Sequence, residues 1–156
     1  MQRSPIFAAL LLALLFAFGE MGLSPLHAKD SSAWLDDPKT AFAQAKKENK
    51  LVLLDFTGST WCPWCKVMNK EVFSTKEFQN YAQQFVLLRI DFPDPQTVPP
   101  KGAPLLEKYF KGDVQLPTIL VLSADGKKLG ETGYKPGGPD VFIKDVDEIA
   151  KKKAGR

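Results

Sequence analysis

The sequence predicts an α/β fold in which a central mixed β-sheet is flanked by helices on both faces. Residues 51–56 and 85–91 are largely apolar runs of strand length, and the helical patterns between them predict a crossover connection. Residues 118–122 form a third apolar run. The turn sequence Ala124-Asp125-Gly126 then leads into residues 127–133, which predicts an antiparallel hairpin at the end of the sheet.

The first two helices are predicted from their start signals. Asp37 is an acid at the N-cap position before a proline, and apolar residues at helical spacing extend this helix over residues 38–49. The second helix follows the first strand after a short loop. It is expected to begin near Cys62, with Pro63 at an early position where proline is favourable.

Capping and proline patterns predict the remaining helices. Ser74 and Glu77 have the spacing of a capping box, so a separate helix is expected before the second strand. Residues 92–104 carry five prolines and are expected to form a loop, followed by a short helix over residues 105–110. Pro139 opens a last helix with largely amphipathic spacing.

The N-terminus predicts export. Arg3 precedes an apolar stretch over residues 6–18, and a short mixed segment ends at Ala28, which is the pattern of a secretory signal peptide. The stretch is shorter than the roughly 20 residues of a transmembrane helix. We therefore expect a cleaved signal over residues 1–28, a periplasmic location, and one domain over residues 29–156. An uncleaved N-terminal membrane anchor is the alternative.

Charge and composition exclude several classes of function. The formal net charge is +3, and the absence of a basic stripe with interleaved aromatic residues argues against nucleic-acid binding. The chain has two cysteines and one histidine, and His27 lies in the predicted signal. Neither a tetrahedral zinc site nor a cysteine–histidine protease dyad is therefore expected. No metal or other cofactor is implied, and nothing demands more than a monomer.

The two cysteines carry the predicted chemistry. Cys62 and Cys65 are three residues apart at the predicted helix start, where Cβ atoms lie about 5–6 Å apart. A disulfide needs about 3.5–4.5 Å, so a modest adjustment allows the bond. The helix N-terminus favours a thiolate at Cys62, the form that attacks disulfides. A loop this short contributes little chain entropy, so the pair predicts thiol–disulfide exchange more than a structural bridge.

Three landmarks resemble the thioredoxin superfamily, and the resemblance covers nearly all of the chain after the predicted signal. Residues 54–56 lead to the motif at 61–66, Leu116-Pro117-Thr118 precedes an apolar strand, and Asp125-Gly126 lies in the hairpin before Gly133. This resemblance implies a thioredoxin-like fold. The spacing around the motif is most similar to exported members, namely the C-terminal domain of DsbD-type proteins and the DsbH-type reductases.

The resemblance implies a catalytic role for three residues. Cys62 would be the attacking thiol and Cys65 the resolving thiol. Asp55 matches the buried acid behind the resolving cysteine, displaced by one residue; the alternative is an edge-strand acid in solvent. Thioredoxins usually carry a lysine that partners this acid, but the matching position here is Leu87, with Arg89 two residues further on. A buried Asp55 without that partner is expected to have a raised pKa.

The remaining motif residues are implied to contact substrate. Pro117 would be a cis-proline facing the disulfide, and Leu116 would offer backbone groups to an extended substrate. Trp61 would cover the surface beside the site or serve as a core aromatic residue. Pro63 would stiffen the helix start, and Trp64 would present an aromatic face to partners.

These observations predict an exported thiol–disulfide oxidoreductase. The expected partners are proteins with disulfides or thiols, and the resemblance favours a reductant that a membrane electron donor keeps reduced. A disulfide-forming oxidase and an isomerase of the same fold remain alternatives. So does a binding or chaperone module whose disulfide never cycles.

Overall fold

The computed structural model describes residues 33–154, so the predicted signal over residues 1–28 lies outside the described part. The helices are α1 (Pro38–Glu48), α2 (Pro63–Met68), the π-helical segment η2 (Asn69–Phe73), α3 (Lys76–Ala82), α4 (Ala103–Tyr109) and α5 (Gly138–Ala154). The strands are β1 (Leu51–Thr57), β2 (Phe85–Asp91), β3 (Thr118–Leu122) and β4 (Lys128–Gly133). None of the helices in this part of the chain is both long and apolar enough to cross a membrane.

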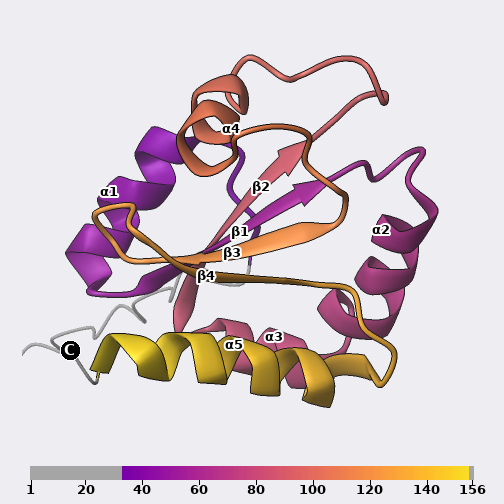
Figure 1. The fold of residues 1–156 in the computed structure, drawn as a ribbon. Helices are drawn as coiled ribbons and strands as arrows, with labels where there is room; N and C mark the ends of the chain where they lie inside the picture. The colour runs from indigo at the N-terminus through magenta and orange to yellow at the C-terminus, as the bar shows by residue number, and fades with distance from the viewer. Residues whose placement is uncertain (1–32, 155–156) are drawn as a thin grey trace, which may run out of the picture.

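The strands form one mixed sheet in the order β2-β1-β3-β4 (Figure 1). β1 pairs in parallel with β2, as the predicted crossover requires, and antiparallel with β3. β3 and β4 form the predicted antiparallel hairpin. The predicted α/β class with a mixed sheet is therefore confirmed.

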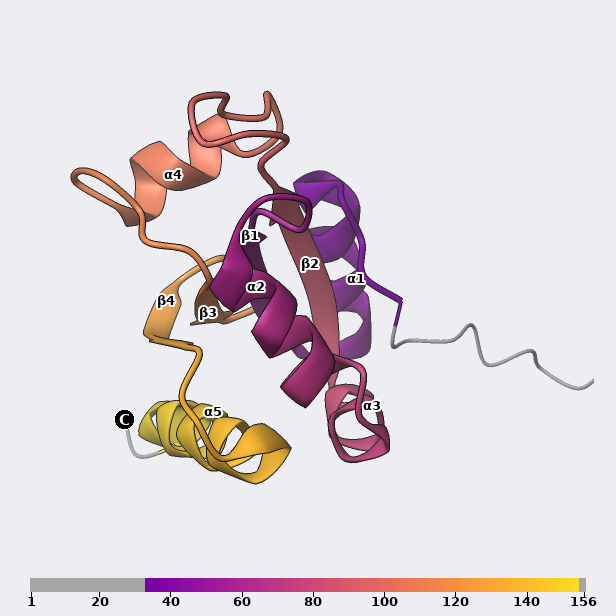
Figure 2. The ribbon, with the colours of Figure 1, turned by 90° about the vertical axis from the view of Figure 1, so that its right-hand side faces the viewer.

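Helices cover both faces of the sheet because alternate strand residues point to opposite sides. Leu53 and Leu87 lie in the buried cluster that includes apolar residues of α2, η2, α3 and α5. Leu54 and Leu88 lie in the other cluster, with residues of α1 and α4. Figure 2, viewed from the side of α2, shows that α2 lies in front of the sheet and α1 behind it. Since Asp55 has the same parity as Leu53, it faces α2.

The expected capping box at Ser74 is wrong by one residue. Thr75 is the N-cap of α3, and its hydroxyl accepts a hydrogen bond from the Phe78 N–H at 3.2 Å. Ser74 instead closes η2, because its N–H donates to the Asn69 carbonyl at 2.8 Å, five residues back. The second predicted helix thus continues through a π-helical segment before α3 begins. α4 also begins earlier than expected, at Ala103.

Candidate active site

The structure brings the two predicted cysteines together as a disulfide at the start of α2. Cys62 and Cys65 are bonded, with Cα atoms 5.3 Å apart. Cys62 is the N-cap of α2, and its sulfur accepts a hydrogen bond from the Cys65 N–H at 3.2 Å. The Gly58 N–H donates to the Cys65 sulfur at 3.5 Å. Backbone donors therefore point at both sulfurs, where they would stabilise a thiolate.

The disulfide is mostly covered but reaches a groove at the surface. The exposed fractions of Cys62 and Cys65 are 4% and 3%. Cys62 nevertheless lines an open groove of about 310 Å³, together with Trp61, Pro63, Trp64, Phe92, Pro95, Val114 and Leu116. Its walls are mainly apolar, and the segment that follows β2 supplies Phe92 and Pro95. Cys62, rather than Cys65, is thus the sulfur that faces this groove.

Leu116 and Pro117 lie directly against the disulfide. The peptide bond between them is cis. The carbonyl oxygen of Leu116 is 3.8 Å from the Cys62 sulfur. Pro117 lines the cavity behind Cys65 and also a second open groove.

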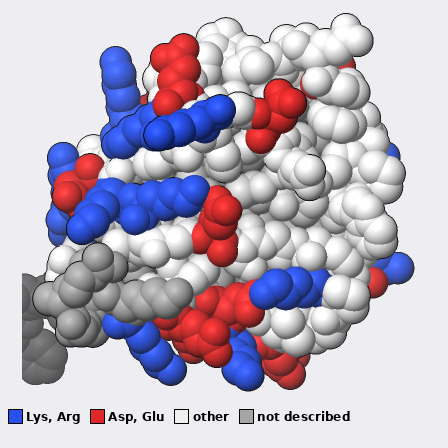
Figure 3. Space-filling model, in the orientation of Figure 1, with Lys and Arg blue, Asp and Glu red and all other residues white. Residues whose placement is uncertain are grey.

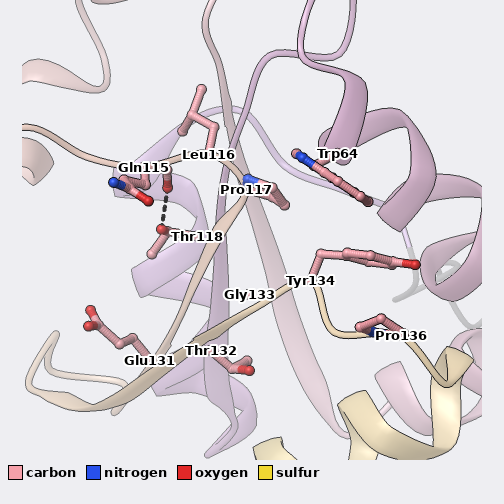
Figure 4. A pocket seen from close by; sticks show the side chains of 10 residues that line it. All are labelled: Trp64, Gln115, Leu116, Pro117, Thr118, Glu131, Thr132, Gly133, Tyr134 and Pro136. Atoms are coloured by element: carbon pink, nitrogen blue, oxygen red, sulfur yellow. Dashed lines mark hydrogen bonds between the residues drawn. The ribbon is translucent and has the colours of Figure 1, made fainter.

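The second groove has a volume of about 610 Å³ and lies between the start of α2 and the strands β3 and β4 (Figure 4). Trp64, which is 60% exposed, stacks on Tyr134 with ring centroids 5.4 Å apart. The Tyr134 hydroxyl donates to the Glu71 carboxylate at 2.7 Å, which holds the aromatic pair in place. Gln115 and Glu131 lie on the opposite side of the groove from this pair (Figure 4).

Trp61 connects the motif to the segment after β2. Its indole N–H donates to the Phe92 carbonyl at 2.9 Å. Its ring packs so closely on Gly58 that a Cβ there would lie 2.6 Å from the indole. Trp61 is half-buried and lines the groove beside Cys62, so it is both a packing residue and part of the surface.

Asp55 is completely buried behind the disulfide, so the alternative of a solvent-exposed acid is excluded. The Arg89 Nε donates to the Asp55 Oδ2 at 2.9 Å, and the two residues are register partners on β1 and β2. Burial raises the pKa of Asp55 to about 6, although the charge and hydrogen bond of Arg89 oppose this rise. The raised pKa was expected, but the premise of a missing partner is wrong, since Arg89 takes that place.

A cavity of about 130 Å³ lies between the buried acid and the disulfide. Asp55 and Cys65 both line it, together with Thr57, Ser59, Lys66, Asn69, Phe73, Arg89 and Pro117. A water molecule takes up about 30 Å³ in the liquid, so the cavity has room for at least one water molecule. Asp55 and Cys65 therefore border the same space, which is large enough for water.

Sequence reasoning missed Trp34 and Tyr134. Trp34 stacks over the Arg89 guanidinium, with the Arg89 Cζ 4.2 Å from the ring centroid. Tyr134 follows β4 and reaches the site only because the hairpin folds back beside α2. Neither residue belongs to a motif, and no local pattern relates them to the cysteines.

Charged side chains are unevenly distributed on the face drawn in Figure 3. Lys and Arg are most frequent on the left-hand part, whereas the right-hand side, toward α2, is largely uncharged. Within residues 33–154, no group of three or more His, Cys, Asp or Glu side chains is arranged to hold a metal ion. The reactive feature of this region is the disulfide.

Comparisons with known proteins agree with this geometry. A sequence model of the thioredoxin-like family matches residues 33–124. Disulfide bond reductase DsbH of Chlamydia pneumoniae is 29% identical over 116 residues, which cover 71% of this chain and 69% of that protein. Thiol:disulfide interchange protein DsbD of Vibrio cholerae is 36% identical over 93 residues, which cover 60% of this chain and 14% of that protein.

The solved structure of a DsbH oxidoreductase has a TM-score of 0.66 to this chain at 28% identity, covering 78% of this chain and 88% of that one. The expected thioredoxin-like fold and the expected relationship to DsbH and DsbD are therefore confirmed. Because the matched residues make up more than half of the chain and include both cysteines, the protein belongs to the thioredoxin-like family.

Proposed function

We propose that the protein is an exported thiol–disulfide oxidoreductase that reduces disulfides in substrate proteins. The observation that carries this proposal is the Cys62–Cys65 disulfide at the start of α2, with Cys62 facing an open groove and Cys65 facing a buried acid. The similarity to a disulfide bond reductase over most of the described residues supports the reducing direction.

In the reduced protein, the Cys62 thiolate attacks one sulfur of the substrate disulfide, and the other substrate sulfur leaves as a thiolate. The product is a mixed disulfide between Cys62 and the substrate. Cys65 then loses its proton to the Asp55 carboxylate and attacks the Cys62 sulfur. This step breaks the mixed disulfide, releases the second substrate thiolate and forms the Cys62–Cys65 bond. The substrate gains two electrons, and the cysteine pair loses them.

The two grooves that meet at Trp64 and Leu116 are the proposed substrate surface. A polypeptide whose sulfur is bonded to Cys62 must pass over these residues. Trp61, Trp64 and Pro63 would offer apolar contacts, and the backbone of Leu116 beside the cis Pro117 would pair with an extended segment. The largely uncharged surface toward α2 suits substrates of varied charge (Figure 3).

The sequence supports export through the predicted signal over residues 1–28. An exported reductant needs a source of electrons, because the periplasm is kept oxidising. We therefore propose that a membrane electron donor reduces the Cys62–Cys65 disulfide. The partial match to the DsbD interchange protein supports a place in an electron-transfer chain of this kind.

The test uses single cysteine variants and a peptide disulfide as substrate. Cys65→Ser should accumulate a mixed disulfide with the peptide, because its resolving thiol is missing. Cys62→Ser should form none and should lose reduction entirely. The reduction potential, measured against glutathione, should lie near −250 mV, and the cysteines should be found reduced when alkylated in cells.

Other outcomes would separate the alternatives. An oxidised pair in cells with a potential near −120 mV would assign a disulfide-forming oxidase instead. Full activity in cells of a Cys62→Ser, Cys65→Ser double variant would assign a binding or chaperone module. Either result would overturn the proposed reductase.

A further inference from the structure

The segment before α1 is fastened to the edge of the sheet. Leu35 forms an isolated parallel bridge with Leu88. The Leu35 N–H donates to the Leu87 carbonyl at 2.9 Å, and the Arg89 N–H donates to the Leu35 carbonyl at 2.8 Å. Since β2 is an edge strand, these bonds extend the sheet by a short piece of backbone and place Trp34 beside the side chain of Arg89.

The guanidinium of Arg89 lies beside two aromatic rings that contact each other. Its Cζ is 4.2 Å from the ring centroid of Trp34 and 5.5 Å from that of Phe73. Trp34 itself packs edge-on against Phe73, with centroids 5.1 Å apart, and stacks on Phe78 at 6.4 Å. Arginine planes are held well by such stacking, and the interaction strengthens when water is excluded. The Arg89 side chain is 24% exposed, so Trp34 covers much of it.

Arg89 binds Asp55 through one oxygen. Its Nε donates to Oδ2, while Oδ1 is buried and makes no hydrogen bond to the described residues. Arginine often binds a carboxylate through two parallel hydrogen bonds, and such a contact would occupy both oxygens. The contact with Oδ2 leaves Oδ1 to accept a proton, in a residue that shares a cavity with Cys65.

We propose that Trp34 is a positioning residue that acts through Arg89 to keep the Asp55 carboxylate in place as the proton acceptor for Cys65. Trp34 covers Arg89, Arg89 holds Oδ2, and Oδ1 takes the Cys65 proton in the resolving step. The catalytic consequence rests on the proposed function, whereas the coupling of Trp34 to Asp55 does not.

Few other charged groups among the described residues lie near Asp55 to influence its pKa. From β2, Asp91 raises the pKa of Asp55, and Arg89 lowers it. From α2, Lys66 and Cys65 line the shared cavity. The register partner on β3 is Ile119, which carries no charge. Loss of Trp34 would expose Arg89 to water and weaken its ion pair with Asp55. Because Arg89 would then lower the pKa of Asp55 less, the effect of desolvation would prevail and the pKa would rise.

The test is a carbon-13 NMR titration of the Asp55 carboxyl in the oxidised protein, which needs no enzymatic activity. Trp34→Leu, which removes the aromatic ring, should move the midpoint upward by about 0.5 pH unit or more. Trp34→Phe keeps a ring over Arg89 and should leave the midpoint nearly unchanged. The matched pair separates stacking from simple burial.

A second set of variants tests whether the effect of Trp34 passes through Arg89, and Trp34→Met, which also removes the ring, replaces Trp34→Leu throughout if that variant fails to fold. Arg89→Met should raise the Asp55 midpoint by more than Trp34→Leu does, because the whole positive charge is lost. In the Arg89→Met background, Trp34→Phe and Trp34→Leu should add no further shift. Equal shifts with and without Arg89, or no shift in Trp34→Leu, would overturn the coupling.

The kinetic consequence is measured in a single turnover of a preformed mixed disulfide. The acidic limb of the resolving rate should move upward in Trp34→Leu, by about the shift seen in the titration. In the Asp55→Asn background, the pH dependence of the resolving rate should be the same with Trp34 and with Trp34→Leu. If the titration shifts but the resolving rate does not, the coupling stands and the role in catalysis falls. If no mixed disulfide forms at all, the proposed function falls and the titration still decides the coupling.

Discussion

Asp55 combines complete burial with one ion-pair partner among the described residues, Arg89. Desolvation disfavours its ionised form, and Arg89 favours that form through its charge and its hydrogen bond. Desolvation is the larger effect, so the pKa rises to about 6. At neutral pH the carboxylate is ionised, yet it binds a proton readily, and this combination suits a group that accepts a proton from a thiol.

The raised pKa of Asp55 predicts a pH-dependent stability. Because the folded state binds the proton more tightly than the unfolded chain, the stabilising contribution is fully present below about pH 4 and is lost as the pH rises through about 6. A shift from 3.8 to about 6 corresponds to about 3 kcal/mol. In urea unfolding of the oxidised protein, the free energy of unfolding should therefore decrease between about pH 4 and pH 6. In Asp55→Asn the part of this decrease that comes from Asp55 should be absent.

The control for this prediction is Asp113→Asn, which changes an exposed acid. It should retain the full pH dependence of the original protein. Asp55→Asn also removes the ion pair with Arg89, so only the change with pH, and not the absolute stability, is informative. An equal pH dependence in Asp55→Asn and the original protein would place the titrating group elsewhere.

At the scale of elements, the connection between α2 and α3 depends on one hydroxyl. Thr75 accepts from the Phe78 N–H, and its own hydroxyl donates to the Val72 carbonyl at 2.7 Å. It therefore binds a carbonyl of the last turn of η2 and begins α3 at the same time. The backbone of Thr75 is extended, with φ −81° and ψ 150°, as an N-cap requires.

We expect Thr75→Ala to lower the free energy of unfolding by about 1–2 kcal/mol, the usual effect of losing an N-cap hydroxyl. Ser74→Ala is the matched control. Its side chain is exposed and receives a hydrogen bond from Asn69 at 3.5 Å, so its loss should change stability by no more than about 0.5 kcal/mol. Urea unfolding of both variants measures the difference. A larger effect for Ser74→Ala would favour the capping box that the sequence pattern suggests.

The error at Ser74 has a physical cause. The capping-box pattern of Ser74 and Glu77 depends on side-chain types alone, whereas the start of α3 depends on where η2 ends. The π-helical hydrogen bond from the Ser74 N–H holds its backbone in the helical region, with ψ −1°, and so excludes it as the extended cap. No local signal in the sequence indicates a five-residue hydrogen-bond spacing.

At the scale of the whole molecule, the sequence predicts the parts of the site that lie close together in the chain. The cysteine pair, the start of α2 and the succession of helices and strands along the chain follow from motif spacing and apolar runs. The pairing of Asp55 with Arg89 depends on the register of β1 and β2, which apolar runs do not determine. The grooves depend on three distant segments, around Trp64, Phe92 and Tyr134, that meet only in the folded chain.

The direction of electron flow is also a property of the whole molecule. The backbone donors at the start of α2 favour a thiolate and hence the reduced protein. The buried carboxylate of Asp55 disfavours a thiolate nearby and hence favours the disulfide. A reductant requires that the second influence be the larger, since strong oxidants are those whose reduced form is stabilised.

The proposed reductase therefore predicts that the oxidised protein is more stable than the reduced protein at about pH 7. By the cycle that links folding and oxidation, each 30 mV of reduction potential below that of the unfolded chain adds about 1.4 kcal/mol to this difference. Urea unfolding of both redox states measures it directly. Asp55→Asn should reduce the difference in stability between the two redox states, because the thiolate then has no buried negative charge beside it. As a control, the stability of the Cys62→Ser, Cys65→Ser double variant should not change on addition of reductant. A reduced form more stable than the oxidised one would mean that the donors of α2 outweigh Asp55, and the protein would then be an oxidant.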